Sequence, residues 1–150
     1  MLGNDYPPAA FGFKVLFAMK TGIADTSFQE VSGIKATIET ESYKELGENG
    51  FEYQLPKPPT YTNLVLKRGI AAMTSPLANW CKSVFEGDFS KFEPIEIKVF
   101  LLDEHLVPQR GWGFSNAFPV SWEVESFNSQ KNEVAIEKIE LRYNFLTRLL

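Results

Sequence analysis

The sequence predicts one mainly β domain with a single flanking helix. Several segments alternate apolar and polar residues with a period of two, which is typical of half-buried strands. Only one segment repeats its apolar residues with the period of an amphipathic helix. The chain has 150 residues with 13 Phe and 3 Trp, a supply that suits a β-rich core. We therefore treat residues 1–150 as a single domain of about seven strands, mostly antiparallel.

The first strand is predicted at residues 11–19, after a short lead-in that ends at Tyr6-Pro7-Pro8. Residues 20–27 are predicted to form a turn. A second strand follows at residues 28–42, with a break or bulge at Gly33. The apolar face of the first strand comprises Phe11, Phe13, Val15, Phe17 and Met19.

The segment 41–60 differs from its surroundings because it is long, polar and rich in Gly and Pro. Asn49-Gly50 is a hairpin signal, and three prolines occupy its end. A connection of this length in a compact domain is either functional or disordered. Its apolar residues are too many for a solvent loop, so we expect them to gain order only against another surface. They are Tyr43, Leu46, Phe51, Tyr53 and Leu55.

A short strand, residues 61–69, precedes the one predicted helix, residues 75–87. Ser75 is placed as the N-cap, Pro76 as the first helical residue and Gly87 as the stop. The apolar stripe of this helix is predicted to pack against the sheet. It comprises Leu77, Trp80, Cys81, Val84 and Phe85.

The last part of the chain reads as strands separated by loops. Residues 94–102 form a strand that ends in a turn at 103–105 and returns. The stretch 118–126 places Phe118, Val120, Trp122 and Val124 on one face. In the closing stretch 132–145, apolar residues alternate with charge, and the phase slips at Glu137-Lys138. We interpret this slip as a bulge that bends the strand.

Residues suited to catalysis are sparse. The one histidine, His105, lies in a predicted turn, and the one cysteine, Cys81, lies on the apolar stripe of the helix. Lys67-Arg68-Gly69 is predicted to be a solvated strand end, and the strand carboxylates, Glu137 among them, are expected on polar faces. We expect no catalytic site, no metal and no cofactor. The net charge of −4 argues mildly against a nucleic-acid binder.

The lone cysteine excludes an internal disulfide and fits a reducing compartment. No apolar run approaches the ~20 residues needed to span a bilayer, and the N-terminus lacks the features of a signal peptide. We therefore expect synthesis in the cytoplasm, and export by a route that needs no signal stays an alternative.

Several motifs in order carry a family resemblance. The Tyr-Pro lead-in is followed by F-x-E-V-S-G at residues 28–33 and by N-L-x-L-K-R-G at residues 63–69. A short helix with Trp80 comes next, then N-A-F-P at residues 116–119. The chain closes with N-E-V-A-I-E-K-I-E-L at residues 132–141. Together these marks resemble the tail tube family of phage tail-like contractile injection systems.

The resemblance implies a two-sheet antiparallel barrel with a flanking helix and a long hairpin arm. Six copies form a ring, and rings stack into a hollow tube within a contractile sheath, bounded by baseplate and terminator proteins. The tube is part of a membrane-anchored, released or virion particle and carries cargo, without reading a nucleic-acid sequence. Residues 41–60 take the place of the family's arm, which docks on neighbouring subunits. Candidates for the lumen wall are Glu123, Glu125, Glu140 and Arg142.

Alternatives remain open at this point. A polar strand face is either a lumen wall or a solvated outer surface, and periodicity does not separate the two. The family also includes specialised rings at the baseplate end and the distal end of the tube. From other functional classes, we consider a monomeric β-barrel that binds a ligand in its aromatic interior and a hydrolase that uses paired strand carboxylates.

Overall fold

The computed structural model describes residues 12–17, 23–44, 52–69, 75–87, 93–125, 130 and 135–150, with side chains from residue 28 onward in the second range. Several predictions concern residues outside this part, namely those for the lead-in, Phe11, Met19, Leu46, Phe51 and Val134. The strands and the helix are β1 (Gly12–Phe17), β2 (Ile23–Phe28), β3 (Glu30–Ser32), β4 (Ala36–Thr37), β5 (Thr40–Tyr43), β6 (Tyr53–Pro56), β7 (Thr60–Tyr61), β8 (Leu64–Gly69), α1 (Pro76–Glu86), β9 (Ile95–Leu102), β10 (Pro108–Val124), β11 (Ile136–Arg142) and β12 (Phe145–Arg148).

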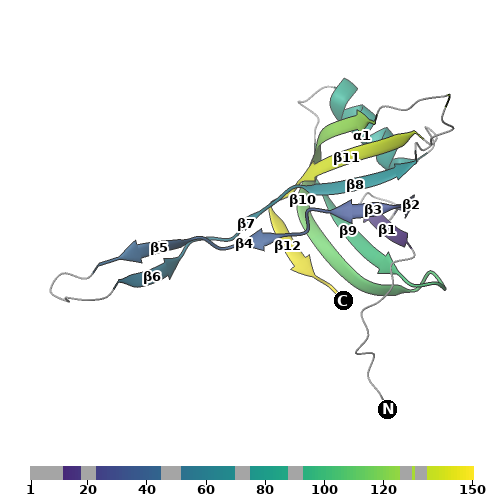
Figure 1. The fold of residues 1–150 in the computed structure, drawn as a ribbon. Helices are drawn as coiled ribbons and strands as arrows, with labels where there is room; N and C mark the ends of the chain where they lie inside the picture. Colours follow the sequence, from purple (N-terminus) through teal and green to yellow (C-terminus); the bar gives the residue numbers. More distant parts are fainter. Residues whose placement is uncertain are drawn as a thin grey trace, which may run out of the picture.

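The main sheet is antiparallel and curls on itself (Figure 1). Its order is β2-β1-β9-β10-β11-β8-β3, with β12 paired to β10. The 17-residue strand β10 joins the two halves of the sheet. It pairs with β9 through residues 108–117 and with β11 through residues 118–124. At the other end, β2 contacts β8, and β1 contacts β3. The predicted mainly β, antiparallel fold with one helix is thus confirmed.

The concave side of the curled sheet encloses one hydrophobic core. Phe114 and Tyr143 meet there edge to face, with ring centroids 4.8 Å apart. Side chains from both halves of the sheet and from α1 contribute. The buried members are Val15, Phe17, Phe28, Leu64, Leu66, Leu77, Trp80, Cys81, Ile97, Val99, Phe114, Ala117, Ile139, Leu141 and Tyr143.

The helix α1 forms where its caps predict. The Ser75 hydroxyl accepts a hydrogen bond from the Ala78 amide at 3.3 Å, and Pro76 opens the first turn. Gly87 ends the helix in an extended conformation, and a Cβ there would lie 2.1 Å from the Ser83 carbonyl oxygen. Trp80 packs against Phe17 with ring centroids 6.0 Å apart. The apolar stripe is buried except at its end.

Two predictions near α1 and β1 were wrong. Phe85, in the last turn of α1, is 43% exposed, whereas the buried residues of the helix, Leu77, Trp80 and Cys81, lie in its first half. The segment 20–27, predicted as a turn, contains most of β2. This strand lies at the edge of the sheet and pairs only with β1 along the path. An edge strand forms through backbone hydrogen bonds and needs no apolar alternation, so its sequence gives little signal.

The predicted phase slip in the closing strand is also wrong. Burial alternates without interruption along β11, and Glu137 occupies a core position in phase with Ile139 and Leu141. The bulge lies instead on the partner strand β10, between Pro119 and Ser121. A buried carboxylate at a core position therefore produced the apparent break in the pattern.

The bulge also changes the apolar face predicted for residues 118–124. Val120 and Trp122 are 42% and 52% exposed, whereas Phe118 and Val124 are half-buried. The four residues do not form one inward face, because an extra residue in one strand reverses the direction of the side chains that follow.

The arm is a narrow antiparallel ribbon that extends from the barrel (Figure 1). It consists of two short ladders, β4 with β7 next to the barrel and β5 with β6 farther out. It therefore starts at Ala36 and ends at Tyr61, rather than spanning residues 41–60. The predicted strand 28–42 is divided among β3, β4 and β5. Gly33 lies at the division with φ +84°, and a Cβ there would meet the Asn63 carbonyl oxygen at 2.0 Å.

Within the described ranges, α1 included, no helix is long and apolar enough to cross a membrane.

Candidate functional site: a charged sheet face and an exposed arm

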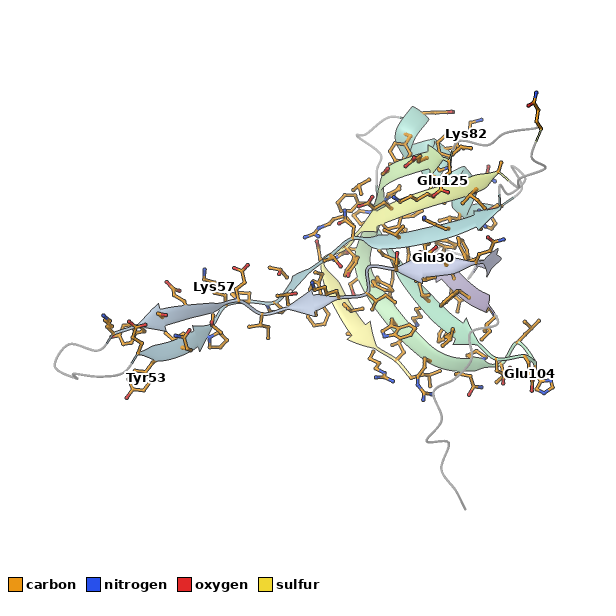
Figure 2. All side chains as sticks on the ribbon, in the orientation of Figure 1. Glu30, Tyr53, Lys57, Lys82, Glu104 and Glu125 are labelled. Carbon is orange, nitrogen blue, oxygen red and sulfur yellow. The ribbon has the colours of Figure 1, made fainter. Side chains whose placement is uncertain are left out.

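One face of strands β3, β8, β11 and β10 points away from the hydrophobic core (Figure 2). On β8, for example, Leu64, Leu66 and Arg68 are buried and the residues between them are not. The antiparallel register places the outward residues of neighbouring strands side by side. We call this surface the charged face. It comprises Glu30, Ser32, Asn63, Val65, Lys67, Ser121, Glu123, Lys138, Glu140 and Arg142.

Two adjacent lysines in the middle of the charged face lie between glutamates. Glu30 lies opposite Lys67, Lys67 opposite Lys138, and Lys138 opposite Glu123. The Lys67 ammonium also reaches the Glu125 carboxylate, with Nζ and Oε1 3.1 Å apart. The hydrogen bond to Glu125, and then the charges of Glu125 and Glu30, raise the pKa of Lys67. The two lysines are therefore balanced by glutamates on either side.

The end of the charged face next to the arm is held by hydrogen bonds. Arg142 Nη1 donates to the Tyr61 carbonyl oxygen at 2.7 Å and to Asn63 Oδ1 at 3.3 Å. Asn63 Nδ2 in turn donates to Glu140 Oε1 at 2.8 Å. Tyr61 belongs to β7, so these contacts connect the sheet directly to the arm.

The four residues predicted to line a lumen lie away from the core. Glu123, Glu140 and Arg142 are on the charged face, and Glu125 contacts it through Lys67. They form two separate groups, since Glu123 and Glu125 lie near the two lysines whereas Glu140 and Arg142 lie at the arm. That this face borders a channel stays a prediction.

The arm presents apolar side chains without a covering surface in the protomer. Tyr43 and Tyr53 are direct cross-strand partners, and Leu55 lies opposite Glu41 on the same ladder. The exposed fractions of Tyr43, Tyr53 and Leu55 are 52%, 43% and 49%. Single exposed apolar residues are common, but a tyrosine pair with a leucine on one thin ribbon is typical of a surface that meets a partner.

The core side of the same strands carries a buried ion pair that the sequence did not indicate. Arg68 Nε donates to Glu137 Oε2 at 3.2 Å, and both residues are almost fully buried. Trp122 Nε1 donates to the other carboxylate oxygen at 2.7 Å. Arg68 Nη2 donates to Ser75 Oγ at 2.7 Å, and its guanidinium lies 4.7 Å from the centre of the Phe28 ring. These contacts tie the start of α1 to β8 and β11.

Two predictions about these charged residues were therefore wrong. Arg68 is not part of a solvated strand end, and Glu137 is not on a polar face. Both residues are oriented toward the core because alternation along β8 and β11 puts them there. A buried charge needs a hydrogen-bonded partner, and Arg68 and Glu137 are partners of each other.

The remaining reactive groups are held in structural positions. Burial, followed by the charge of Glu137, raises the pKa of the Cys81 thiol to about 12, which keeps it protonated near neutral pH. His105 lies in the β9–β10 turn, where Asp103 Oδ1 accepts hydrogen bonds from the His105 and Val107 amides at 2.8 and 2.9 Å. No group of three or more His, Cys, Asp or Glu side chains suited to a metal ion occurs among the residues whose placement the structure gives.

Sequence reasoning missed several residues of these surfaces. Lys67 belongs to the charged face, and Asn63 and Tyr61 connect it to the arm. Alternation along β8 would have found Lys67, since Leu64 and Leu66 fix the phase of that strand. No local signal identifies the contacts of Asn63 and Tyr61, because their partners on β11 lie about 80 residues away.

Comparison with known proteins adds a family and a set of solved structures. The family model described as T4-like virus tail tube protein gp19 matches residues 9–147. A chain from the six-fold symmetrised baseplate of the anti-feeding prophage is 28% identical, with a TM-score of 0.80 and coverage of 97% of both chains. A chain from the sheath-tube complex of the extracellular contractile injection system PVC in its extended state is 25% identical. Its TM-score is 0.77, over 97% of this chain and 93% of that chain.

More distant structures share the fold alone. Hcp1 from Flavobacterium johnsoniae is 13% identical, with a TM-score of 0.59 over 92% of this chain and 94% of that chain. No curated protein sequence is significantly similar to the chain.

Proposed function

The chain belongs to the family of T4-like virus tail tube proteins, and from this premise we propose that it is a ring-forming subunit of the inner tube of a contractile injection system. Six copies form a ring, and rings stack into a hollow tube inside a sheath. The observation that carries the proposal is the match over 97% of both chains to a chain of a six-fold symmetrised baseplate. The match to a chain of a sheath-tube complex supports the same assembly and its partners.

The charged face is the surface that we assign to the lumen. The four-stranded half of the sheet that carries it ends in β3 on one side and in residues 118–124 of β10 on the other. Pairing of these edges between neighbouring subunits would remove exposed ladder groups and continue the charged face around a channel. Glu123, Glu125, Glu140 and Arg142 would then line the wall.

The charge balance of this wall favours transport without a specific binding site. With Glu125, the face has four carboxylates and three cations, counting Lys67, Lys138 and Arg142. Four carboxylates against three cations leave the face with a small net negative charge, so cargo is selected by shape and charge rather than by a specific site. Among the described elements none offers a base-reading helix, and we expect that no nucleic-acid sequence is read.

The arm is the surface that we assign to contacts between subunits. Its apolar residues Tyr43, Leu46, Phe51, Tyr53 and Leu55 would be covered by an adjacent subunit, in the same ring or the next. A two-stranded ribbon alone is marginally stable in water, and such contacts would stabilise it. Residues 1–150 then act as one domain with an arm, without catalysis, made in the cytoplasm and incorporated into a contractile particle.

A specialised ring at one end of the tube is the second candidate. The 28% identical structure is that of a baseplate, which favours a position near that end. Chains solved in a sheath/tube terminator and in a tube-terminating cap share the fold at TM-scores of 0.78 and 0.77. Rings that polymerise into long tubes without other components would identify the main tube subunit, and rings that do not stack would identify an end ring.

Light scattering coupled to size-exclusion chromatography tests ring formation. The account predicts a species near six times the 17.0 kDa of the protomer, or longer polymers, as the protein concentration rises. A species of 17.0 kDa at every concentration would contradict it and would restore the monomeric ligand-binding barrel as the better hypothesis.

A further inference from the structure

The arm joins the barrel through a root that its own hydrogen bonds do not fix. The ladder nearest the barrel has two residue pairs, Ala36 with Tyr61 and Thr37 with Thr60. Below it, the Thr62 hydroxyl donates to the Gly33 carbonyl oxygen at 2.6 Å. These contacts join the outgoing and returning chains to each other. Beyond the end of the β3–β8 ladder at Ser32 and Val65, the direction of the pair relative to the barrel needs a further restraint.

Contacts from β11 provide that restraint. The last residue pair between β8 and β11 is Leu64 with Leu141, so the ladder ends before the arm begins. Arg142, the next residue of β11, continues the connection by donating to the Tyr61 carbonyl oxygen and to Asn63 Oδ1. Glu140 Oε1 accepts a hydrogen bond from the side-chain amide of the same Asn63. Two side chains of β11, Glu140 and Arg142, thus hold the returning chain at Tyr61 and Asn63.

Aromatic packing restrains the same residue through its side chain. The Tyr61 ring lies 5.7 Å from the Tyr143 ring and 6.0 Å from the Phe145 ring, measured between centroids. Tyr143 is itself buried against Phe114. The carbonyl of Tyr61 is therefore held by Arg142, and its ring packs against Tyr143 in the core and against the half-exposed Phe145.

We infer that Glu140, Asn63 and Arg142 form an arm clamp, which sets the direction in which the arm leaves the barrel before it meets a neighbouring subunit. Arg142 is the positioning residue, because a planar guanidinium can donate to two acceptors at fixed angles. An arm already directed toward its docking surface loses less conformational freedom on assembly. Glu140 and Arg142, two of the four proposed lumen residues, thus also have a role in assembly. That role in assembly rests on the proposed function.

The direct test measures the direction of the arm in the unassembled protein. Spin labels are attached at Lys57→Cys, between β6 and β7 and outside the outer ladder, and at Glu104→Cys in the β9–β10 turn, which Figure 2 shows far apart, on a Cys81→Ala background. Double electron–electron resonance at a concentration below that of assembly gives the distribution of distances between the labels. We expect a narrow distribution in the parent, a broad one in Arg142→Gln and an intermediate one in Arg142→Lys.

Lys138→Gln is the matched control. Lys138 lies on the same charged face and the same strand as Arg142, but its cross-strand neighbours are Lys67 and Glu123 instead of the arm. Its removal changes the charge equally and should leave the distribution narrow. If circular dichroism shows that Arg142→Gln does not fold, Asn63→Ala is used instead, because it also removes the hydrogen bonds of the clamp. A broad distribution in the parent, or an equally narrow one in Arg142→Gln and Asn63→Ala, would overturn the inference.

The assembly readout uses the same variants without labels. We expect the protein concentration for half-maximal ring formation to rise by roughly tenfold in Arg142→Gln, equivalent to about 1.4 kcal/mol, with no such change in Lys138→Gln. Equal assembly of Arg142→Gln and the parent would contradict a role of the clamp in assembly. A parent that forms no rings would contradict the proposed function while leaving the distance measurement to decide on the clamp.

Discussion

At the scale of single residues, Glu137 shows how one buried charge can mislead a reading of alternation. In β11 its side chain points to the core side, in phase with Ile139 and Leu141, and is 4% exposed. A carboxylate in an apolar phase looks like a register shift when the strand is read alone. The partner that allows its burial, Arg68, lies 69 residues earlier in the chain. No local pattern contains that information.

The buried pair predicts a strong coupling in unfolding experiments. Arg68→Met alone or Glu137→Leu alone should lower the free energy of unfolding by about 3–5 kcal/mol, because each leaves a buried charge unpaired. The double replacement should lower it by less than either single change. Urea unfolding of the four proteins measures this. The partly exposed pair Lys67 and Glu125 is the control and should show a much smaller coupling. Additive losses at Arg68 and Glu137 would contradict this account.

At the scale of elements, those with strong local signals were predicted and those stabilised by partners were not. The cap at Ser75, the proline at Pro76 and the apolar stripe specify α1 within the chain itself. The arm strands β4, β5 and β6 have no buried face, so nothing in their sequences marks their ends. The side on which Glu123, Glu140 and Arg142 lie was predictable because alternation is local, but the contacts of Arg142 with the arm were not.

The helix predicts a contrast between two aromatic residues. Trp80 is 5% exposed and packs on Phe17, so Trp80→Ala should lower the free energy of unfolding by about 3–5 kcal/mol. Phe85 is 43% exposed, and Phe85→Ala should change it by only about 0.5 kcal/mol. Chemical denaturation of both variants checks this. Similar losses in the two variants would show that the end of the helix is buried as well.

The arm predicts a separation of folding from assembly. Glu39 and Lys57 are joined by a backbone hydrogen bond of 2.8 Å, so residues 40–56 can be replaced by a short Gly-Ser turn without straining the root. None of the described residues in this stretch, 40–44 and 52–56, belongs to the hydrophobic core, so circular dichroism and the melting temperature should stay close to those of the parent. Ring stacking or ring formation, observed by light scattering, should be lost.

A milder variant tests the same role of the arm without shortening the chain. Tyr43→Ser with Tyr53→Ser keeps the chain length and should weaken assembly in the same direction, since it removes only the apolar pair. We also expect the amides of β5 and β6 to exchange rapidly in the monomer and slowly in the assembly. Unchanged polymerisation of the shortened protein would remove the arm from the assembly mechanism.

At the scale of the whole molecule, one side of the sheet encloses the hydrophobic core, and the other side carries a face that the described protomer leaves uncovered. The four-stranded half of the sheet has two edges and a face whose charges are balanced, and the arm carries apolar residues away from the barrel (Figure 1). The ordered motifs in the sequence resemble those of tail tubes, and the family match over residues 9–147 confirms that resemblance. The register of the sheet and the extent of the arm required the structure, because both depend on residues far apart in the chain.

The most direct test of the central claim is a cryo-electron microscopy map of the assembled protein. We predict a six-fold ring whose channel is lined by the charged face, with Glu140, Arg142 and at least one of Glu123 and Glu125 directed toward the channel and α1 on the outside. A ring in which these four residues lie on the outer wall, or a particle without a central channel, would contradict the account.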